Sequence, residues 1–500
     1  MNKQLKGILA GCGVLALLGG GLAWLLLNDP GTGNEESSSG SSEEEHAELW
    51  QYTSDHVSKV RVEQPGKEPY TAIRRWDETQ STDYEGNPTV EKIANYYLEG
   101  YDSLPMNTIS IRLLTTRSTS VNAVTTIAEN VSESDLAQYG LDKPVKVTLT
   151  VDDADDVSFL IGSKTPVSSY TYLSMAGSST VYTVSTSDIE PYLTDVLGYL
   201  GTEVNPEQAE DDERTVQSTR ITRKGLDYDL YFVYDPFYAE NANSGSAAMH
   251  VMEEPIHALL NVDKSNDATH GLFGLNASEV LTPFPQEADL TKAGLDDPFI
   301  RVTTVMSDGK TMELRIGNTY TDADGNTKYY GYFEGVDCIY GFSPDSFVYE
   351  TVTADDVASR IIIDMYVWDV SKVRCEADGE TLDFSVLATD QSDAVVQLNG
   401  ESYENVERYR QLYSFLLKTA AEDLILTQPD DVGAEMASVY VEAKDGKRSY
   451  DIKFYEASGL KAYVSVDGQI RFRCRKSYVT TLIDNIKIFG DEEKAFTMSW

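Results

Sequence analysis

A segment of ten residues occurs twice in this chain, and this repeat constrains the fold more than any other feature of the sequence. Residues 135–144 and 289–298 share the pattern D-L-x-x-x-G-L-D-x-P at an offset of 154 residues. An apolar strand pattern, an Ile-Gly pair and a late Val-Tyr or Ile-Tyr pair follow both copies in the same order. Agreement over so many spaced positions indicates an internal duplication, so we expect similar units in tandem.

A second similarity extends the repeat to the last third of the chain. Residues 57–63 (VSKVRVE) recur as residues 370–376 (VSKVRCE), at an offset of 313 residues. We therefore predict three units, over residues 49–200, 214–355 and 366–490. The third unit has diverged, because it lacks the ten-residue pattern.

Each predicted unit combines strands with a helix. The alternation of Val60 and Val62 with charged neighbours predicts a strand at the start of the first unit. Apolar residues spaced i, i+3, i+4 over residues 90–101 predict an amphipathic helix behind it, and residues 406–416 show the same spacing in the third unit. A β-meander with Gly-containing turns, such as Asp445-Gly446, is expected to close each unit.

The repeated ten-residue segment has a structural explanation that needs no chemistry. In each copy the glycine allows the positive φ that ends a helix, the aspartate can cap a turn, and the proline forces an extended exit. In the first copy we expect a short helix that begins after Ser132 and ends at Gly140. The residues interpreted in this way are Gly140, Asp142, Pro144, Gly294, Asp296 and Pro298.

The N-terminal part of the chain is predicted to hold it in a membrane. Residues 7–27 are 21 uncharged, mostly apolar residues, which as a helix would span about 30 Å of hydrocarbon. Lys3 and Lys6 precede this segment and acids follow it, so we expect a single-pass anchor with residues 1–6 in the cytoplasm and the body outside. A cleaved signal peptide would need a small-x-small site, and the lipoprotein-like residues 9–12 (LAGC) lie too close to Lys6.

Residues 28–48 join this anchor to the body as a tether. The tether is rich in Gly and Ser and holds seven acidic and no basic residues, so we expect an extended coil in which His46 is solvated. The whole chain of 500 residues has a net charge of −42. This charge excludes nucleic acid as a partner, because phosphate contacts need clustered Lys and Arg.

These features together predict an α+β fold. The expected architecture is a tandem array of antiparallel β-meanders, each with a helix, behind a single N-terminal transmembrane helix. Strands rich in Tyr, Val, Thr and Ile suit antiparallel sheets with one solvated face.

The repeated pattern, the Ile-Gly pair after it and the opening V-S-K-V-R strand resemble the bacterial domain-of-unknown-function family 4340. The resemblance extends over the whole predicted exported body, together with its anchor and tether. It implies an exported, singly anchored protein, with genes often located near ABC-transporter subunits of the gliding-motility auxiliary type. The shared motifs are structural, and the resemblance supplies no catalytic residue.

The sequence lacks the common catalytic and metal-binding signatures. Its five histidines include none in an H-E-x-x-H motif, and there is no G-x-S-x-G and no complete P-loop. His250, His257 and His270 are spaced by 7 and 13 residues, which places no pair on adjacent helical positions. We therefore predict no catalytic residue, no bound cofactor and no metal site.

Two other patterns leave alternatives open. Acidic residues 152–156, 322–326 and 83–87 could bind calcium, but hairpin tips explain them better, since an EF-hand needs Gly and Glu that are missing after Asp322. Tyr-rich residues 228–234 and 329–333 could form sugar-binding platforms, although half-buried sheet packing is the commoner role of such residues.

The cysteines do not form a disulfide framework. One of the four, Cys12, lies in the predicted anchor, which leaves Cys338, Cys375 and Cys474 in the body. The last two fall in one predicted unit, where they could pair or remain buried thiols.

The expected function is a non-enzymatic, membrane-anchored extracytoplasmic interaction or scaffold protein, accessory to an ABC-type transporter or another cell-envelope assembly. Its expected contacts are the membrane, through residues 7–27, and a membrane-protein partner, with the oligomeric state left open. The alternative is a cell-wall carbohydrate-binding or glycan-hydrolysing protein. Paired carboxylates do not decide this question, because 82 acidic residues always place some pair in proximity.

Overall fold

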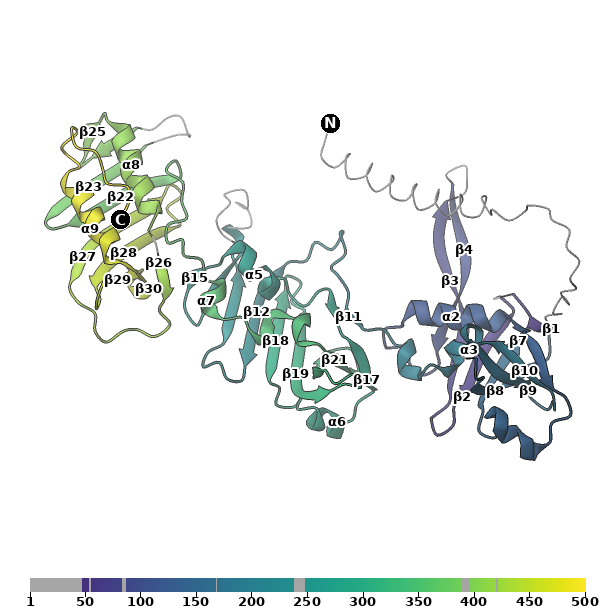
Figure 1. Ribbon diagram of the computed structural model, residues 1–500. Coiled ribbons are helices and arrows are strands. Elements are labelled where there is room, and N and C mark those ends of the chain that lie inside the picture. The colour runs from purple at the N-terminus through teal and green to yellow at the C-terminus, as the bar shows by residue number, and fades with distance from the viewer. Residues whose placement is uncertain are drawn as a thin grey trace, which may run out of the picture.

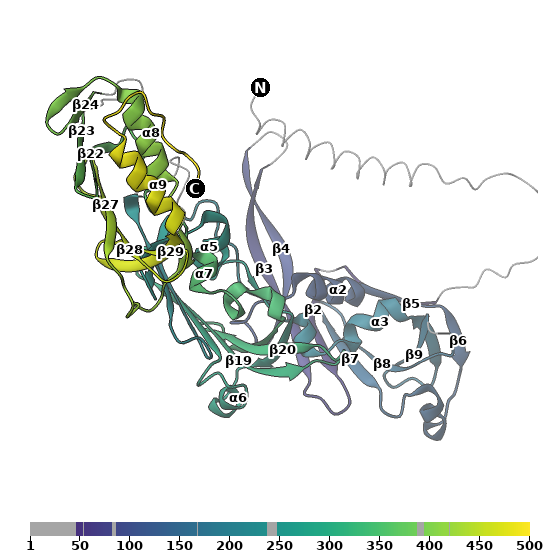
Figure 2. The ribbon, with the colours of Figure 1, turned by 60° about the vertical axis from the view of Figure 1, so that its left-hand side comes forward.

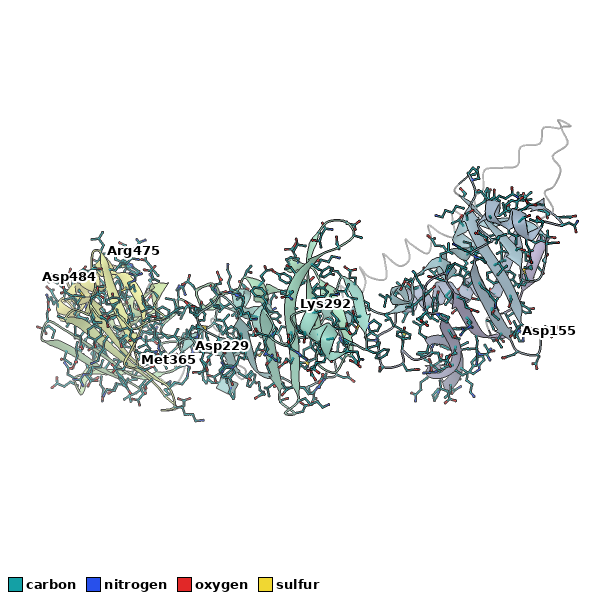
Figure 3. All side chains as sticks on the ribbon, turned by 90° about the horizontal axis from the view of Figure 1, so that it is seen from below. Asp155, Asp229, Lys292, Met365, Arg475 and Asp484 are labelled. Atoms are coloured by element: carbon teal, nitrogen blue, oxygen red, sulfur yellow. The ribbon has the colours of Figure 1, made fainter. Side chains whose placement is uncertain are left out.

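A computed structural model describes residues 47–53, 55–82, 87–167, 169–237, 248–387, 395–419 and 421–500. Within these ranges the chain forms antiparallel sheets of eight, nine and nine strands, together with two small two-stranded sheets. The three large sheets follow one another in a row (Figure 1). Figure 3 shows this row from Asp155 through Lys292 to Arg475 and Asp484. We call each large sheet with its helices the first, second and third unit.

The three large sheets share one strand order, except that the first lacks one edge strand. On one side of the opening strand lie two strands in the first unit and three in the second and third, and on the other side lie a four-stranded meander and a short strand that closes the far edge. The opening strands are β2 (Val57–Glu63), β12 (Val216–Arg223) and β22 (Val370–Ala377). Three sheets with one connectivity are the structural counterpart of the repeats in the sequence.

The bounds of the remaining strands follow in sheet order. The first unit adds β4 (Pro88–Leu98), β3 (Tyr70–Thr82), β7 (Val145–Val151), β8 (Val157–Lys164), β9 (Tyr170–Met175), β10 (Val181–Ser185) and β6 (Thr125–Ala128). The second unit adds β15 (Ala258–Leu259), β14 (His250–Glu254), β13 (Leu230–Tyr234), β18 (Ile300–Met306), β19 (Thr311–Thr321), β20 (Thr327–Phe333), β21 (Cys338–Phe342) and β17 (Glu279–Pro283). The third unit adds β25 (Glu401–Tyr403), β24 (Val396–Leu398), β23 (Glu380–Val386), β27 (Glu435–Ala443), β28 (Ser449–Glu456), β29 (Lys461–Val466), β30 (Gln469–Arg475) and β26 (Ala421–Leu424).

Short helices pack on the large sheets. In the third unit α9 contacts β22, β27 and β29, and Figure 2 shows α8 and α9 side by side on that sheet. The α-helices are α2 (Thr108–Thr119), α3 (Thr186–Leu193), α5 (Val262–Thr269), α6 (Glu287–Lys292), α7 (Ala354–Val357), α8 (Val406–Leu417) and α9 (Lys476–Lys487). The 3₁₀ helices are η1 (Glu133–Tyr139), η2 (Val196–Tyr199), η4 (Pro344–Ser346) and η5 (Val348–Glu350).

The units are joined by small contacts. Strand β11 (Glu203–Asn205) pairs with β16 (Leu275–Asn276), and the ring of Tyr101 lies 5.6 Å from that of Phe284, so the first two units share one apolar core. The third unit has a core of its own, built around residues such as Phe384 and Tyr409. The remaining small sheet pairs β1 (Ala47–Gln51) with β5 (Ser120–Ala123).

The predicted α+β fold class is wrong, because the structure is mostly β-sheet. The helices are short, and most of the regular secondary structure described lies in large antiparallel sheets of up to nine strands. The anchor that formed part of that prediction, residues 7–27, lies outside the described residues. Among the residues that are described, no helix has both the length and the apolar character needed to cross a membrane.

The helix predicted over residues 90–101 illustrates the reason for this error. These residues form β4, which pairs with β3 over eleven consecutive residue pairs from Ala72–Leu98 to Thr82–Pro88. The segment is rich in β-branched and aromatic residues, which favour strands. The helical spacing of its apolar residues is coincidental. The segment forms a strand because it pairs with β3.

Other local predictions are confirmed. Val60 and Val62 are buried while their neighbours Lys59 and Arg61 are exposed, and α8 covers the helix predicted from residue 406. The short helix before Gly140 exists as η1 and ends there at φ 70°. Ser132 precedes it as expected, but its hydroxyl hydrogen-bonds the Asp135 carboxylate at 2.6 Å and not a backbone N–H.

Candidate binding surfaces

The histidines singled out in the sequence have separate structural roles. His250 is buried in β14, with Nε2 2.8 Å from the carbonyl oxygen of Val216, and burial lowers its pKa. His257 is exposed and contacts Glu253, while His270 ends α5. No group of three or more His, Cys, Asp or Glu side chains able to hold a metal occurs among the residues described. His46 lies outside them.

The acidic segments that could bind calcium are turns whose carboxylates have protein partners. The Asp322 carboxylate accepts hydrogen bonds from the backbone N–H groups of Asp324 and Asn326, at 3.0 and 2.8 Å, and lies 3.2 Å from Lys328 Nζ. These hydrogen bonds, above all that from Asn326, lower the pKa of Asp322 to about 2. Asp152 pairs with Arg74 at 2.5 Å. Residues 83–86 lie outside the described part of the chain.

The tyrosines of residues 228–234 and 329–333 are half-buried or buried. In the first stretch the guanidinium of Arg220 covers the Tyr231 ring at 4.1 Å, and in the second Arg315 covers Tyr332 at 4.8 Å. Tyr329 is 9% exposed. These rings serve as sheet packing, so neither stretch is an open aromatic platform.

The body cysteines are buried free thiols. Cys338, Cys375 and Cys474 form no disulfide in the structure. Burial raises the pKa of each thiol to about 12, which removes the thiolate needed for reaction. The structure therefore contains no disulfide bond between Cys375 and Cys474.

A long two-stranded hairpin projects from the first unit (Figures 1 and 2). Strand β3 pairs with β2 only from Tyr70 to Ile73, so beyond that point β3 and β4 continue alone. An isolated hairpin is marginally stable in water, and this one leaves Trp76, Val90 and Ile93 exposed. Exposed apolar residues on a projecting element indicate a contact surface.

Polar contacts stabilise the base of this hairpin. The guanidinium of Arg75 lies 5.0 Å from the centre of the Tyr97 ring, and the hydroxyl of Tyr97 donates to Asp77 at 2.6 Å. Asn95 donates to the same carboxylate at 2.7 Å, and these two hydrogen bonds lower the pKa of Asp77. The strand that carries Ile93 is therefore well organised although it pairs there only with β3 within the described residues.

A groove of about 430 Å³ runs between β4 and α2. Five consecutive residues, 93–97, line it. Because successive side chains of a strand point to opposite faces, the groove follows the edge of β4 and not one face of the hairpin. Strand β4 is the edge strand of its sheet and, within the described ranges, pairs only with β3. Its outer backbone groups are thus available to another chain, with Met106, Ile111 and Arg112 opposite.

The groove side of α2 is polar and positive, because Thr108, Arg112 and Thr115 line it together with the buried Ile111. Leu113, which is 50% exposed, lies outside the groove and lines a separate pocket between α2 and α3. The helix contains Arg112 and Arg117 but no acid, which is unusual in a chain of net charge −42. Arg117 pairs with Asp188 at 2.7 Å, whereas the guanidinium of Arg112 has no ion pair or hydrogen bond among the residues described.

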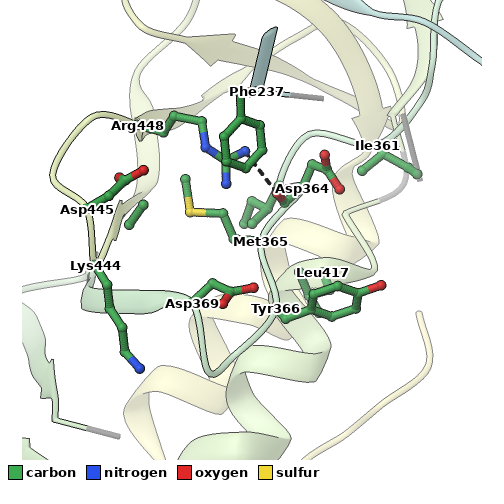
Figure 4. Close-up of a pocket in the computed structure, with 12 residues that line it drawn as sticks. Phe237, Ile361, Asp364, Met365, Tyr366, Asp369, Leu417, Lys444, Asp445 and Arg448 are labelled. Carbon is green, nitrogen blue, oxygen red and sulfur yellow. Dashed lines mark hydrogen bonds between the residues drawn. The ribbon is translucent and has the colours of Figure 1, made fainter. Parts of the chain in front are cut away.

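A cavity of about 370 Å³ lies where the second unit meets the third (Figure 4). Phe237 enters it from the second unit, and its ring centre lies 3.4 Å from the guanidinium carbon of Arg448. Tyr366 lines the cavity and stacks on Trp368 at 4.5 Å between ring centres. Asp369 lies in the wall of the cavity. Burial raises the pKa of its carboxyl group, although the nearby positive charges of Lys444 and Arg448 act to lower it.

Sequence reasoning missed both surfaces. The groove was hidden because β4 was interpreted as a helix and α2 carries too few apolar residues to show a clear stripe. The signal that could have found the hairpin is a pair of β-branched and aromatic segments separated by residues 83–87 (DYEGN), a typical turn composition. Nothing in the sequence places Phe237 beside Arg448.

Residues 97–225 match the family model described as a domain of unknown function (DUF4340). The match begins in β4 and includes α2 and the first copy of the repeated ten-residue segment. It confirms the family resemblance seen in the sequence. No curated protein and no solved structure matches the chain.

Proposed function

We propose that this chain, which belongs to the DUF4340 family through residues 97–225, is an interaction protein of the cell envelope that binds its partner along the free edge of β4. The observation that carries the proposal is the groove between β4 and α2, with the free strand edge and the exposed Ile93 on one side and Arg112 of α2 on the other.

The chemistry of the groove defines the segment that would fit it. An extended segment can add to β4 through backbone hydrogen bonds and place alternate apolar side chains beside Ile93. Burying a side chain such as Ile93 in this way contributes up to about 3 kcal/mol. Because Arg112 is positive and without an ion pair in the described structure, an acidic residue at that end of the segment would be favoured.

The partner that we propose is a membrane-embedded protein, such as a subunit of an ABC-type transporter. Support comes from residues 7–27, whose apolar character suits a membrane anchor, and from the family resemblance. In this proposal residues 1–6 lie in the cytoplasm, residues 28–48 are the tether and the three units lie outside the cell.

Co-purification with a matched variant tests this function. The full-length chain is isolated from native membranes in mild detergent, as wild type, as Ile93→Glu and as Val167→Glu. Both positions are exposed in the first unit, but only Ile93 lines the groove. One integral membrane protein should accompany the wild type and Val167→Glu and be lost from Ile93→Glu. Recovery of that protein with all three chains, or with none, would contradict the proposal.

The membrane attachment has a test of its own. Deleting residues 7–27 should move the chain from the membrane fraction to the soluble fraction of the cell envelope, and protease added to intact cells or protoplasts should digest the body of the wild type. Retention of the deleted chain in the membrane fraction, or protection of the body, would show that the location is wrong.

Glycan binding is a second candidate, supported by the cavity of Figure 4. Tyr366 is 38% exposed and stacks on Trp368 beside the carboxyl groups of Asp364 and Asp369. Aromatic rings next to carboxylates are the usual means of holding a sugar. Soluble cell-wall fragments should then bind the wild type and fail to bind Tyr366→Ala, and equal binding would exclude this site.

A further inference from the structure

A second cavity lies between the second and third units, next to that of Figure 4. Its volume is about 360 Å³, and Arg448 and Ile361 line both cavities. The second unit contributes the segment around β14 and β15, and the third contributes β28, β30 and the turn before β28. The polar residues that carry the argument are Asp235, His257, Lys447, Arg448, Asp467 and Arg471.

Arg471 is an incompletely paired charge in the wall of this cavity. Its side chain is 12% exposed, and its Nε atom is buried without a hydrogen-bond partner in the described structure. The nearest carboxylate is that of Asp467, 3.6 Å from a terminal nitrogen, which is longer than a good charge-assisted hydrogen bond. A guanidinium held in this way has lost hydration without gaining full compensation.

The neighbouring arginine on the same strand shows the contrast. Arg475 lies on the same face of β30, four residues further, and its side chain is 62% exposed. Its Nε donates to Glu422 at 2.7 Å, so its charge is paired. Burial lowers the pKa of Arg471, which agrees with its weak pairing.

Basic groups gather in this cavity although the protein is strongly acidic. Lys447, Arg448 and Arg471 line it with the two carboxylates of Asp235 and Asp467, and the charge of Glu253 also acts on Arg471. Guanidinium groups present parallel N–H donors that match the oxygens of phosphate or carboxylate groups. The volume lies within the usual range for small-molecule sites, and such sites are frequent where two domains meet.

We propose that this cavity binds a small oxyanion ligand, carrying a phosphate or a carboxylate group, through Arg471 and Arg448. The ligand would supply the hydrogen-bond acceptor that Arg471 Nε lacks within the described structure. Because the second unit lines the opposite wall, a bound ligand also joins the two units.

The test uses the purified full-length chain and two probes, inorganic phosphate and succinate, with sodium chloride at equal ionic strength as the reference. Binding is measured by titration calorimetry, and the thermal unfolding temperature is measured in parallel. One of the two probes should bind and raise the unfolding temperature above that in chloride, and the better probe identifies the oxyanion. Equal unfolding temperatures in all three salts would overturn the proposal.

Three variants locate the site. Arg471→Gln should weaken binding by at least about tenfold, while Arg475→Gln, on the same face of the strand, should bind as the wild type does. Asp235→Asn should bind several-fold more tightly, since it removes a negative charge from the wall and retains the oxygen that accepts the N–H of Phe237. The last variant decides the question if Arg471→Gln does not fold. If Arg471→Gln and Asp235→Asn both bind the oxyanion as tightly as the wild type does, the proposal is wrong.

Discussion

The backbone of Gly162 lies against the carbonyl oxygen of Tyr139, so closely that a Cβ atom on Gly162 would overlap that oxygen. The second unit repeats this relationship between Gly317 and Ala293. In both units the carbonyl belongs to the residue before the glycine of the repeated segment, Gly140 or Gly294. The Ile-Gly pair recurs after the repeat because this close approach recurs.

This contact gives the first prediction. Gly162→Ala and Gly317→Ala should each lower the local free energy of unfolding by about 1–3 kcal/mol, because the new methyl group forces the segment away from the strand. Gly490→Ala is the matched control, since a Cβ there meets no atom within 4 Å. Hydrogen exchange resolved by peptide measures the effect, as the three units need not unfold together. Unchanged exchange in β8 and β19 of the variants would contradict the explanation.

Arg408 in α8 holds the C-terminal segment of the third unit. It is 6% exposed and donates to the carbonyl oxygens of Phe489, Ile488, Asp491 and Lys494, at 2.7, 2.6, 2.9 and 2.8 Å. One guanidinium thus donates hydrogen bonds to four carbonyl oxygens at and after the end of α9.

Replacing this guanidinium should be costly. Arg408→Met should lower the stability of the third unit by at least about 2 kcal/mol, because buried carbonyls lose their donors. Arg408→Lys should restore little, since one ammonium group does not present a planar fork of donors. Arg112→Met, at an exposed guanidinium, should change stability by less than about 0.5 kcal/mol in the same urea titration. Equal stability of Arg408→Met and Arg112→Met would refute this role.

The buried imidazole of His250 predicts a pH dependence. Its pKa is lowered in the folded state by burial, so below the ordinary value near 6.5 the unfolded chain binds a proton that the folded chain does not. Stability should therefore be complete above that pH and fall as the pH drops below it. The free energy of unfolding of His250→Gln should fall less between pH 7.5 and 5.5 than that of the wild type. Urea unfolding measures this free energy, with hydrogen exchange of β14 as the signal. Parallel curves for the two chains would show that His250 does not contribute.

The thiols predict selective protection from alkylation. Cys338, Cys375 and Cys474 should not react with iodoacetamide at pH 8 in the folded chain, because burial raises the pKa of each to about 12. All three should react in guanidinium chloride without a reducing agent, since none is in a disulfide. Peptide mass spectrometry counts the labelled sites, and a need for reduction would reveal a bond that the structure does not contain.

Local features of the sequence predicted local structure well. Gly140 ends η1 as expected because a positive φ is a backbone requirement, and α8 follows from the apolar spacing after Asn405. The error over β4 arose because strand pairing with β3 is a long-range contact that spacing alone does not show. That error changed the fold class and hid the groove.

The proposed oxyanion cavity was beyond prediction for a similar reason. Arg471 and Asp235 are far apart in the sequence, and nothing near either residue indicates that a different unit covers it. An arginine in an alternating strand suggests an exposed side chain, as Arg475 is. The burial of Arg471 depends on how the third unit meets the second.

The measurement that tests the proposed function most directly is site-specific photo-cross-linking in native membranes. A photoreactive amino acid is placed at Ile93 or Arg112, which line the groove, and at Val167 or Val262, which are also exposed but distant in sequence from both groove elements. We predict that both groove positions form an adduct with the same integral membrane protein and that neither control position does. Absence of that adduct at the groove, or its formation at all four positions, would contradict the proposal that this protein binds its partner between β4 and α2.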